Sequence, residues 1–122
     1  MITLRYYDKG KRLDRVWYDS SNIVYTECED KLNDLKTLRV VFKKGATYEY
    51  KKVDVNDYVL FVAGGIHGSN GKALNEIIKP KYEFEKIEDT NLDKLESDFA
   101  EISEMLAAEK ASEDADGQSK ND

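Results

Sequence analysis

The stretch LRVVFKKGATYEY, residues 38–50, decides the fold of this chain. Its first half places Leu38, Val40 and Phe42 at every second position, and its second half does the same with Tyr48 and Tyr50. Successive side chains of a strand point to opposite faces, so this spacing predicts two strands that each bury one face. A Lys-Gly pair between them supplies a tight turn. The stretch therefore predicts an antiparallel hairpin.

The sequence on both sides of the hairpin predicts further strands and three helices. Asp54 caps a short helix, and Ser69 or Asn70 caps a second helix, which Pro80 ends. From Thr90 onward, apolar residues follow one helical stripe to about residue 110. The other expected strands span residues 2–7, 13–18, 23–26 and 82–85, with a polar loop over residues 27–33.

These elements predict an α+β fold. It has an antiparallel sheet of about six strands, two short helices inserted before the last strand and a longer C-terminal helix. We expect one ligand-binding domain over residues 1–110, because a chain of 122 residues holds one modest core. Residues 111–122 lack large apolar side chains, so we expect them to form a disordered acidic tail.

The composition indicates where in the cell the protein lies and which kinds of partner it binds. No segment is apolar enough for a membrane span or an export signal, so we expect a cytoplasmic protein without a membrane partner. Residues 1–82 carry 15 Lys and Arg against 11 Asp and Glu, whereas residues 83–122 carry 4 against 14. The mildly basic body favours an anionic ligand, and the acidic end disfavours DNA. Simple solubility is the alternative explanation for the acidic end.

The chain offers little material for catalysis or metal binding. It has one histidine, His67, and one cysteine, Cys28. Neither a zinc site nor a His-based catalytic triad can be assembled from them. We therefore expect a protein that is not an enzyme, with no catalytic residue, no metal ligand and no cofactor.

The glycine-rich segment AGGIHGSNGK, residues 63–72, is the first candidate for a ligand site. It precedes a predicted helix, and backbone N–H groups at a helix start bind phosphate where glycines allow close approach. It is not a triphosphatase loop, because its spacing is one residue too long and Ala73 replaces the metal-binding hydroxyl. An ordinary capped loop is the alternative. The candidate ligand-binding residues are Gly68, Ser69, Asn70, Gly71 and Lys72.

Aromatic residues are numerous, with eight Tyr, four Phe and one Trp. Interleaved with basic residues on strands, they suit base stacking and phosphate pairing, although core packing explains most strand aromatics. Trp17 and Tyr18 are adjacent, so we expect one of them to point outward. Trp17, Tyr18 and Arg39 are therefore further candidate ligand contacts.

The order of several short motifs resembles the KTSC module, a small domain also appended to some lysyl-tRNA synthetases. The resemblance covers roughly residues 20–82, with residues 27–34 as an insertion and residues 64–67 as a lengthened loop. The module's signature falls on Ser69, Gly71 and Asn75, and Phe61 lies on the helix before it, so the resemblance adds Asn75 and Phe61 to the candidate ligand-binding residues. The other matching motifs are Ser20-Ser21-Asn22-Ile23, the hairpin with Gly45, Val53, Tyr58 and Tyr82.

A KTSC-like core with added N-terminal strands and a C-terminal helix is similar to the phage-encoded sponge proteins that counter Thoeris defence. Those proteins sequester a cyclic ADP-ribose isomer that serves as an alarm signal. The resemblance implies a non-enzymatic sponge for a cyclic nucleotide signal, located in the host cytoplasm. It also implies a homo-oligomer of at least two chains, with ligand pockets at protomer edges.

Two other functions stay open from the sequence. An RNA- or tRNA-binding accessory module would use the basic strand face with its tyrosines and arginines. A protein-interaction module would act through the C-terminal helix, whose apolar stripe packs on its own sheet or on a partner subunit.

Overall fold

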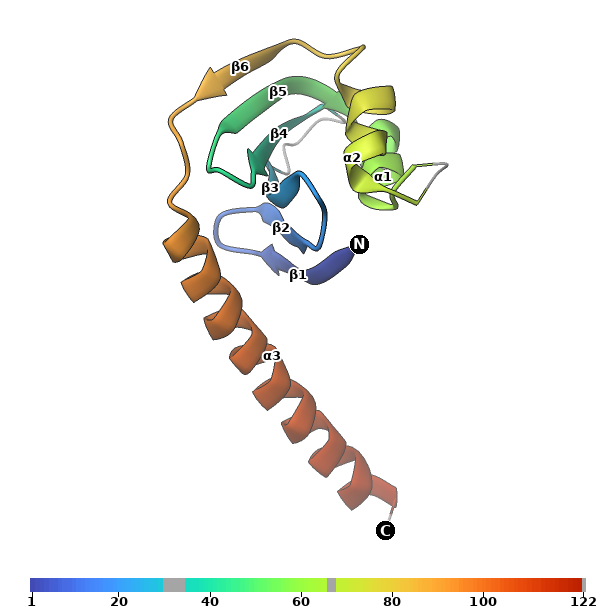
Figure 1. Cartoon of the computed structure of the whole chain (residues 1–122). Helices are drawn as coiled ribbons and strands as arrows, with labels where there is room; N and C mark the ends of the chain where they lie inside the picture. Colours follow the sequence, from blue (N-terminus) through green and yellow to red (C-terminus); the bar gives the residue numbers. More distant parts are fainter. Residues whose placement is uncertain (30–34, 66–67, 122) are drawn as a thin grey trace. The chain divides into compact units, whose positions relative to one another are not determined.

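The structure is a computed structural model that describes residues 1–29, 35–65 and 68–121. It has two compact units, residues 1–92 and 93–122. The expected extent of the ligand-binding domain, residues 1–110, stays a prediction. The first unit holds a six-stranded antiparallel sheet and short helical segments inserted before the last strand (Figure 1). This architecture confirms the predicted α+β fold.

The six strands lie in the sheet in chain order, each beside its sequence neighbours. The predicted hairpin is confirmed, with Leu38 opposite Tyr50 and Val40 opposite Tyr48. Its turn contains Gly45 with φ of 95°, a conformation that residues with a Cβ rarely adopt. The strands are β1 (Ile2–Asp8), β2 (Leu13–Tyr18), β3 (Ile23–Glu29), β4 (Leu35–Phe42), β5 (Thr47–Asp54) and β6 (Phe84–Ile87).

Strand β3 is longer than the sequence pattern predicts. Glu27 and Cys28 were expected in a loop, but they pair with Arg39 and Leu38 of β4. Cys28 is buried between two solvent-facing glutamates, which hides the alternation in a polar stretch. The rest of the predicted loop and insertion, residues 30–34, lies outside the described residues.

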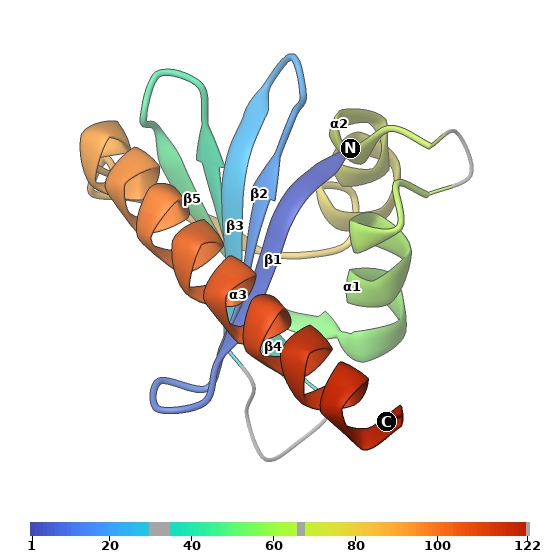
Figure 2. The ribbon, with the colours of Figure 1, turned by 90° about the horizontal axis from the view of Figure 1, so that it is seen from below.

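The helical segments α1 (Val55–Val62), α2 (Asn70–Ala73) and η1 (Leu74–Ile78) follow the hairpin. Asp54 caps α1 by accepting a 2.8 Å hydrogen bond from the Asn56 N–H, as predicted. Segment η1 is a π-helical turn that directly continues α2, and the N–H of Lys79 donates to the carbonyl of Leu74. Figure 2 shows α1 and α2 side by side.

The main core lies between one face of the sheet and these helical segments. Burial of its apolar side chains is the dominant favourable term in folding. The helical segments contribute Tyr58, Phe61, Val62, Ala73, Leu74 and Ile78. The sheet contributes Val16, Tyr18, Ile23, Cys28, Leu38, Val40, Tyr50 and Val53.

The second unit consists of the helix α3, which runs from Leu92 to Asn121. The predicted C-terminal helix is therefore confirmed, and it is helical as far as Asn121. The disorder expected for residues 111–122 stays a prediction. Residues 107–116 are rich in Ala and Glu, which have high helix propensity, and contain neither Gly nor Pro.

Candidate functional site

In the structure, the side chains of Ser69 and Asn70 in the glycine-rich segment form hydrogen bonds with neighbouring backbone groups. Ser69 caps α2, where its side chain accepts a 3.4 Å hydrogen bond from the Lys72 N–H. Asn70 is 3% exposed, and its side-chain amide donates to the carbonyls of Phe61, at 2.8 Å, and Val62, at 3.1 Å. The ammonium of Met1 donates to the Asn70 Oδ1 at 3.2 Å. Asn70 therefore ties the end of α1 to the start of α2.

The remaining loop candidates lie nearer the surface. Gly68, with φ of 68°, Lys72 and Asn75 are exposed. A Cβ added at Gly71 would lie 3.9 Å from the Oγ atoms of Ser20 and Ser69, so three residues of the KTSC-like motifs come together here. The ligand role of the loop stays a prediction, and its His67 lies outside the described residues.

The three aromatic candidates are all buried. Phe61 is fully buried, and its ring centroid lies 6.2 Å from that of Tyr18. The Tyr18 hydroxyl forms a 2.8 Å hydrogen bond with Thr26, and burial raises the pKa of the Tyr18 phenol. Trp17 is 4% exposed, and its ring centroid lies 4.8 Å from that of Tyr25. Neither Trp17 nor Tyr18 presents an exposed ring, since Trp17 is 4% and Tyr18 is 7% exposed.

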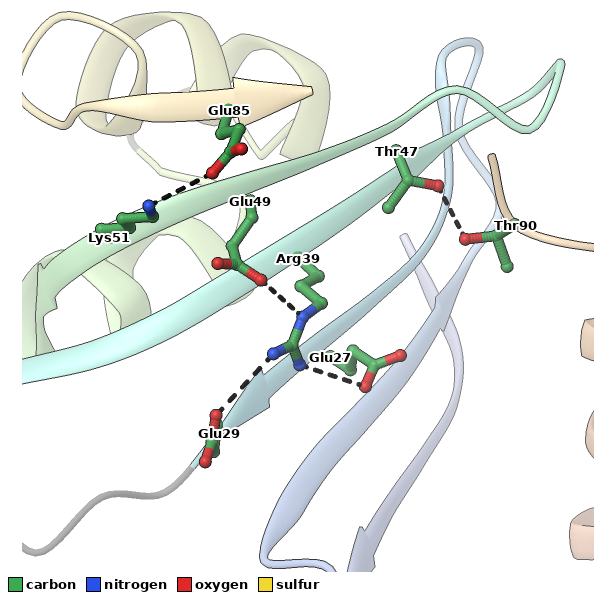
Figure 3. Close-up of polar contacts among 8 residues, drawn as sticks. All are labelled: Glu27, Glu29, Arg39, Thr47, Glu49, Lys51, Glu85 and Thr90. Atoms are coloured by element: carbon green, nitrogen blue, oxygen red, sulfur yellow. Dashed lines mark hydrogen bonds and ion pairs between the residues drawn. The ribbon is translucent and has the colours of Figure 1, made fainter. Parts of the chain in front are cut away.

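Arg39 is surrounded by carboxylates (Figure 3). Its Nε donates to Glu49 Oε2 at 2.9 Å, and its terminal nitrogens lie 3.6 Å from Glu27 and 3.8 Å from Glu29. Lys51 pairs with Glu85 at 3.2 Å on neighbouring strands. Three carboxylates around one guanidinium leave an excess of negative charge, which disfavours a phosphate on Arg39.

A cleft lined by aromatic side chains lies where β4, β5 and β6 meet the end of η1. Its volume is about 430 Å³, within the range of small-molecule sites. The Tyr48 ring centroid lies 5.7 Å from that of Phe42 and 5.8 Å from that of Phe84. Phe84 also lies 5.7 Å from Tyr50, so the four rings form one continuous row. Such a row offers flat faces on which a planar ring can stack.

Lys79 gives this aromatic cleft a positive charge. Its Nζ lies 5.9 Å from the centroid of Phe42, and it follows the wide turn of η1 directly. Phe84 remains 59% exposed, whereas Tyr50 is 2% exposed and burial raises the pKa of its phenol. The cleft thus combines a buried aromatic floor, an exposed aromatic wall and a cation.

A second cavity, of about 450 Å³, lies between β1, β2, β3 and α1 and contains an internally paired polar network. Asp14 accepts from Arg5 Nε at 3.0 Å, from Arg5 Nη2 at 2.7 Å and from the Tyr58 hydroxyl at 2.7 Å. Burial raises the pKa of Tyr58, and the hydrogen bond to Asp14 raises the pKa of Arg5. These groups satisfy one another, so this network ties α1 to the sheet.

The described residues show neither a metal cluster nor a membrane helix. Within residues 1–29, 35–65 and 68–121, no three His, Cys, Asp or Glu side chains are placed to hold a metal ion. Over the same ranges, every helix is too short or too polar to cross a bilayer.

The fold and the cleft define a small α+β protein with one antiparallel sheet and an aromatic, positively charged cleft at the end of that sheet. The chain contains a KTSC domain, which is detected at residues 33–82 and confirms the module predicted from the motifs. Comparison with curated proteins gives no match. The detected domain includes most of the cleft, and Phe84 lies just beyond its end.

Tyr48 and Tyr50 belong to the strand aromatics that suit base stacking, but no residue of this cleft was among the candidate ligand-binding residues. Phe42, Tyr48 and Tyr50 were assigned to the hairpin, and Phe84 to the last strand. In the observed register, the aromatic residues at positions 42, 48, 50 and 84 all fall on one face of the sheet. The sequence signals only that Tyr48 and Tyr50 share a face of their strand. Lys79 had no such signal, because its position depends on the π-helical turn.

Proposed function

We propose that this protein is a non-enzymatic sponge that binds and sequesters a cyclic nucleotide signal, a cyclic ADP-ribose isomer, and so blocks Thoeris-like defence signalling. The observation that carries the proposal is the row formed by Phe42, Tyr48, Tyr50 and Phe84 with Lys79 at its side. Stacking on aromatic side chains binds a base, and an ammonium binds a phosphate.

The charge of the cleft favours an anionic ligand over a cationic one. Aromatic rows also bind quaternary ammonium groups. Here Lys79 already places a cation beside Phe42, so a second cation would be repelled. A planar ring carrying phosphate satisfies both parts of the cleft.

The same charge pattern favours a small nucleotide over an RNA strand. An RNA-binding face needs several cations free to contact successive phosphates. Arg39 is surrounded by three glutamates, and Arg5 is held by Asp14. These pairings leave less positive charge on the strands than the sequence alone indicates.

The proposal includes the oligomer that the family resemblance implies. The aromatic cleft lies at the β6 edge of the sheet, and Phe84 on that edge is exposed. A neighbouring chain at this edge would enclose the ligand and raise its affinity.

Retention of an intact ligand tests sequestration. Purified protein, in molar excess, is mixed with a cyclic ADP-ribose isomer. The mixture is then passed through a filter that retains the protein. We expect the ligand to stay with the protein and to be recovered unchanged by mass spectrometry after heating. Free passage of the ligand, or recovery of a cleaved product, would contradict the proposal.

A further inference from the structure

The register of β5 and β6 places a second lysine on the face that carries the aromatic cleft. Tyr50 lies opposite Phe84, and Tyr48 lies opposite Lys86. Residues directly opposite each other in antiparallel strands share a face, and their Cβ atoms are near neighbours. Phe84 and Lys86 are two positions apart on β6, so both project to the same side as the two tyrosines. Lys86 therefore lies beside Tyr48, next to the residues that line the cleft.

Lys79 and Lys86 approach the aromatic row from different elements. Lys79 comes from the end of η1, next to Phe42, and Lys86 comes from the edge strand β6. Both side chains are exposed, and neither forms an ion pair with another described residue. A lysine without a carboxylate partner keeps its charge available for an anion.

The opposite face of the same strands has the reverse charge. Glu49 lies opposite Glu85 in the register, and Glu49 also contacts Arg39 (Figure 3). An anionic ligand is therefore repelled from that face and attracted to the side of the two lysines.

We propose that Lys79 and Lys86 together bind a diphosphate, so that the cleft selects a nucleotide with two linked phosphates over one with a single phosphate. This inference rests on the proposed function of the cleft and adds to it a second cation and a basis for selectivity. The base stacks on the rings while each ammonium contacts one phosphate.

Calorimetric titration of two cyclic nucleotides tests the diphosphate preference. The probes are cyclic ADP-ribose, with two phosphates, and cyclic AMP, with one, both at low ionic strength because salt screens exposed charges. We expect Lys86→Gln to weaken cyclic ADP-ribose binding about tenfold and cyclic AMP binding less than about threefold, given the usual strength of a charge-assisted hydrogen bond. Lys79→Gln should weaken both.

Lys44→Gln is the matched control, since Lys44 is an exposed lysine in the β4–β5 turn without an ion pair to a described residue. It should change neither affinity. If wild-type protein binds cyclic ADP-ribose and Lys86→Gln leaves that affinity unchanged, or weakens both probes equally, the diphosphate inference is wrong and the proposed function stands. If wild-type protein binds neither probe, the proposed function fails and the inference fails with it.

Discussion

Lys79 lies over the ring of Phe42, with its Nζ 5.9 Å from the ring centroid. An ammonium near an aromatic face contributes about 0.5–1 kcal/mol at an exposed site, enough to hold the side chain at the cleft without burying its charge. The contact therefore joins the π-helical turn to the β4–β5 hairpin and leaves the cation accessible to a ligand.

Two lysine substitutions test whether the phosphate binds at the aromatic cleft or at the glycine-rich loop. We expect Lys79→Gln to weaken binding of cyclic ADP-ribose about tenfold, because a charge-assisted hydrogen bond is lost. Lys72→Gln, in the loop, should leave the affinity within about twofold. Titration calorimetry on both variants measures this difference, and a larger loss for Lys72→Gln would return the site to the loop.

Replacement of Asn70 should destabilise the fold. Asn70→Ala removes two buried hydrogen bonds to the carbonyls at the end of α1, so we expect a loss of about 2–3 kcal/mol in the free energy of unfolding. Urea denaturation measures it. Asn75→Ala, at an exposed position on η1, is the control and should change stability by less than about 0.5 kcal/mol. Equal effects would show that the Asn70 contacts are not structural.

Removal of the Tyr58 hydroxyl should also destabilise the protein. Tyr58→Phe deletes the 2.7 Å hydrogen bond to Asp14, a charged acceptor, and we expect a loss of about 1–2 kcal/mol. The control is Tyr6→Phe, since the Tyr6 hydroxyl makes no hydrogen bond with a described residue. Thermal and urea unfolding of both variants give the comparison, and a Tyr58→Phe protein as stable as Tyr6→Phe would contradict the role of the network.

Asp57 should make stability depend on pH in the acid range. The Tyr82 hydroxyl, which donates to Asp57 Oδ2 at 2.6 Å, and then Lys81 lower the pKa of this carboxyl below its ordinary value of 3.8. A lowered folded-state pKa stabilises the protein above the ordinary value, and this contribution is lost as pH falls through the folded-state value.

We therefore expect wild-type protein to be more stable than Asp57→Asn at pH 7, with a smaller difference at pH 3. Urea unfolding at the two values measures it. Asp89→Asn removes an exposed carboxylate without an ion pair to a described residue, and as the control it should change stability by less than about 0.5 kcal/mol. A constant gap between wild type and Asp57→Asn would contradict this account.

The sequence predicts most of the fold because its local signals agree with the tertiary structure. The period-two pattern of the hairpin, the Asp54 cap and the Ser69 cap all appear where expected. The prediction fails where the composition hides a strand. Acidic residues flank the buried Cys28 and conceal the end of β3.

The site is less predictable, because it depends on residues that meet only in three dimensions. Phe42, Tyr48 and Phe84 come from three strands, and Lys79 reaches them from the end of a π-helical turn. Arg39 was a candidate ligand contact from the sequence, but neighbouring strands surround it with carboxylates that no linear motif reveals. Phe61 is fully buried, and the Asn70 amide donates to the carbonyl of Phe61, a contact that the linear sequence does not reveal.

Titration of wild-type protein and Phe84→Ala with a cyclic ADP-ribose isomer tests the central claim most directly. Phe84 is 59% exposed, so its replacement should hardly affect folding, and Leu60→Ala, at a site 51% exposed on α1, is the matched control. We predict tight binding by wild type and by Leu60→Ala, and an affinity at least about tenfold lower for Phe84→Ala, because stacking on an aromatic ring contributes roughly 1–3 kcal/mol per base. No binding by wild-type protein at micromolar concentration, or equal binding by Phe84→Ala, would contradict the account.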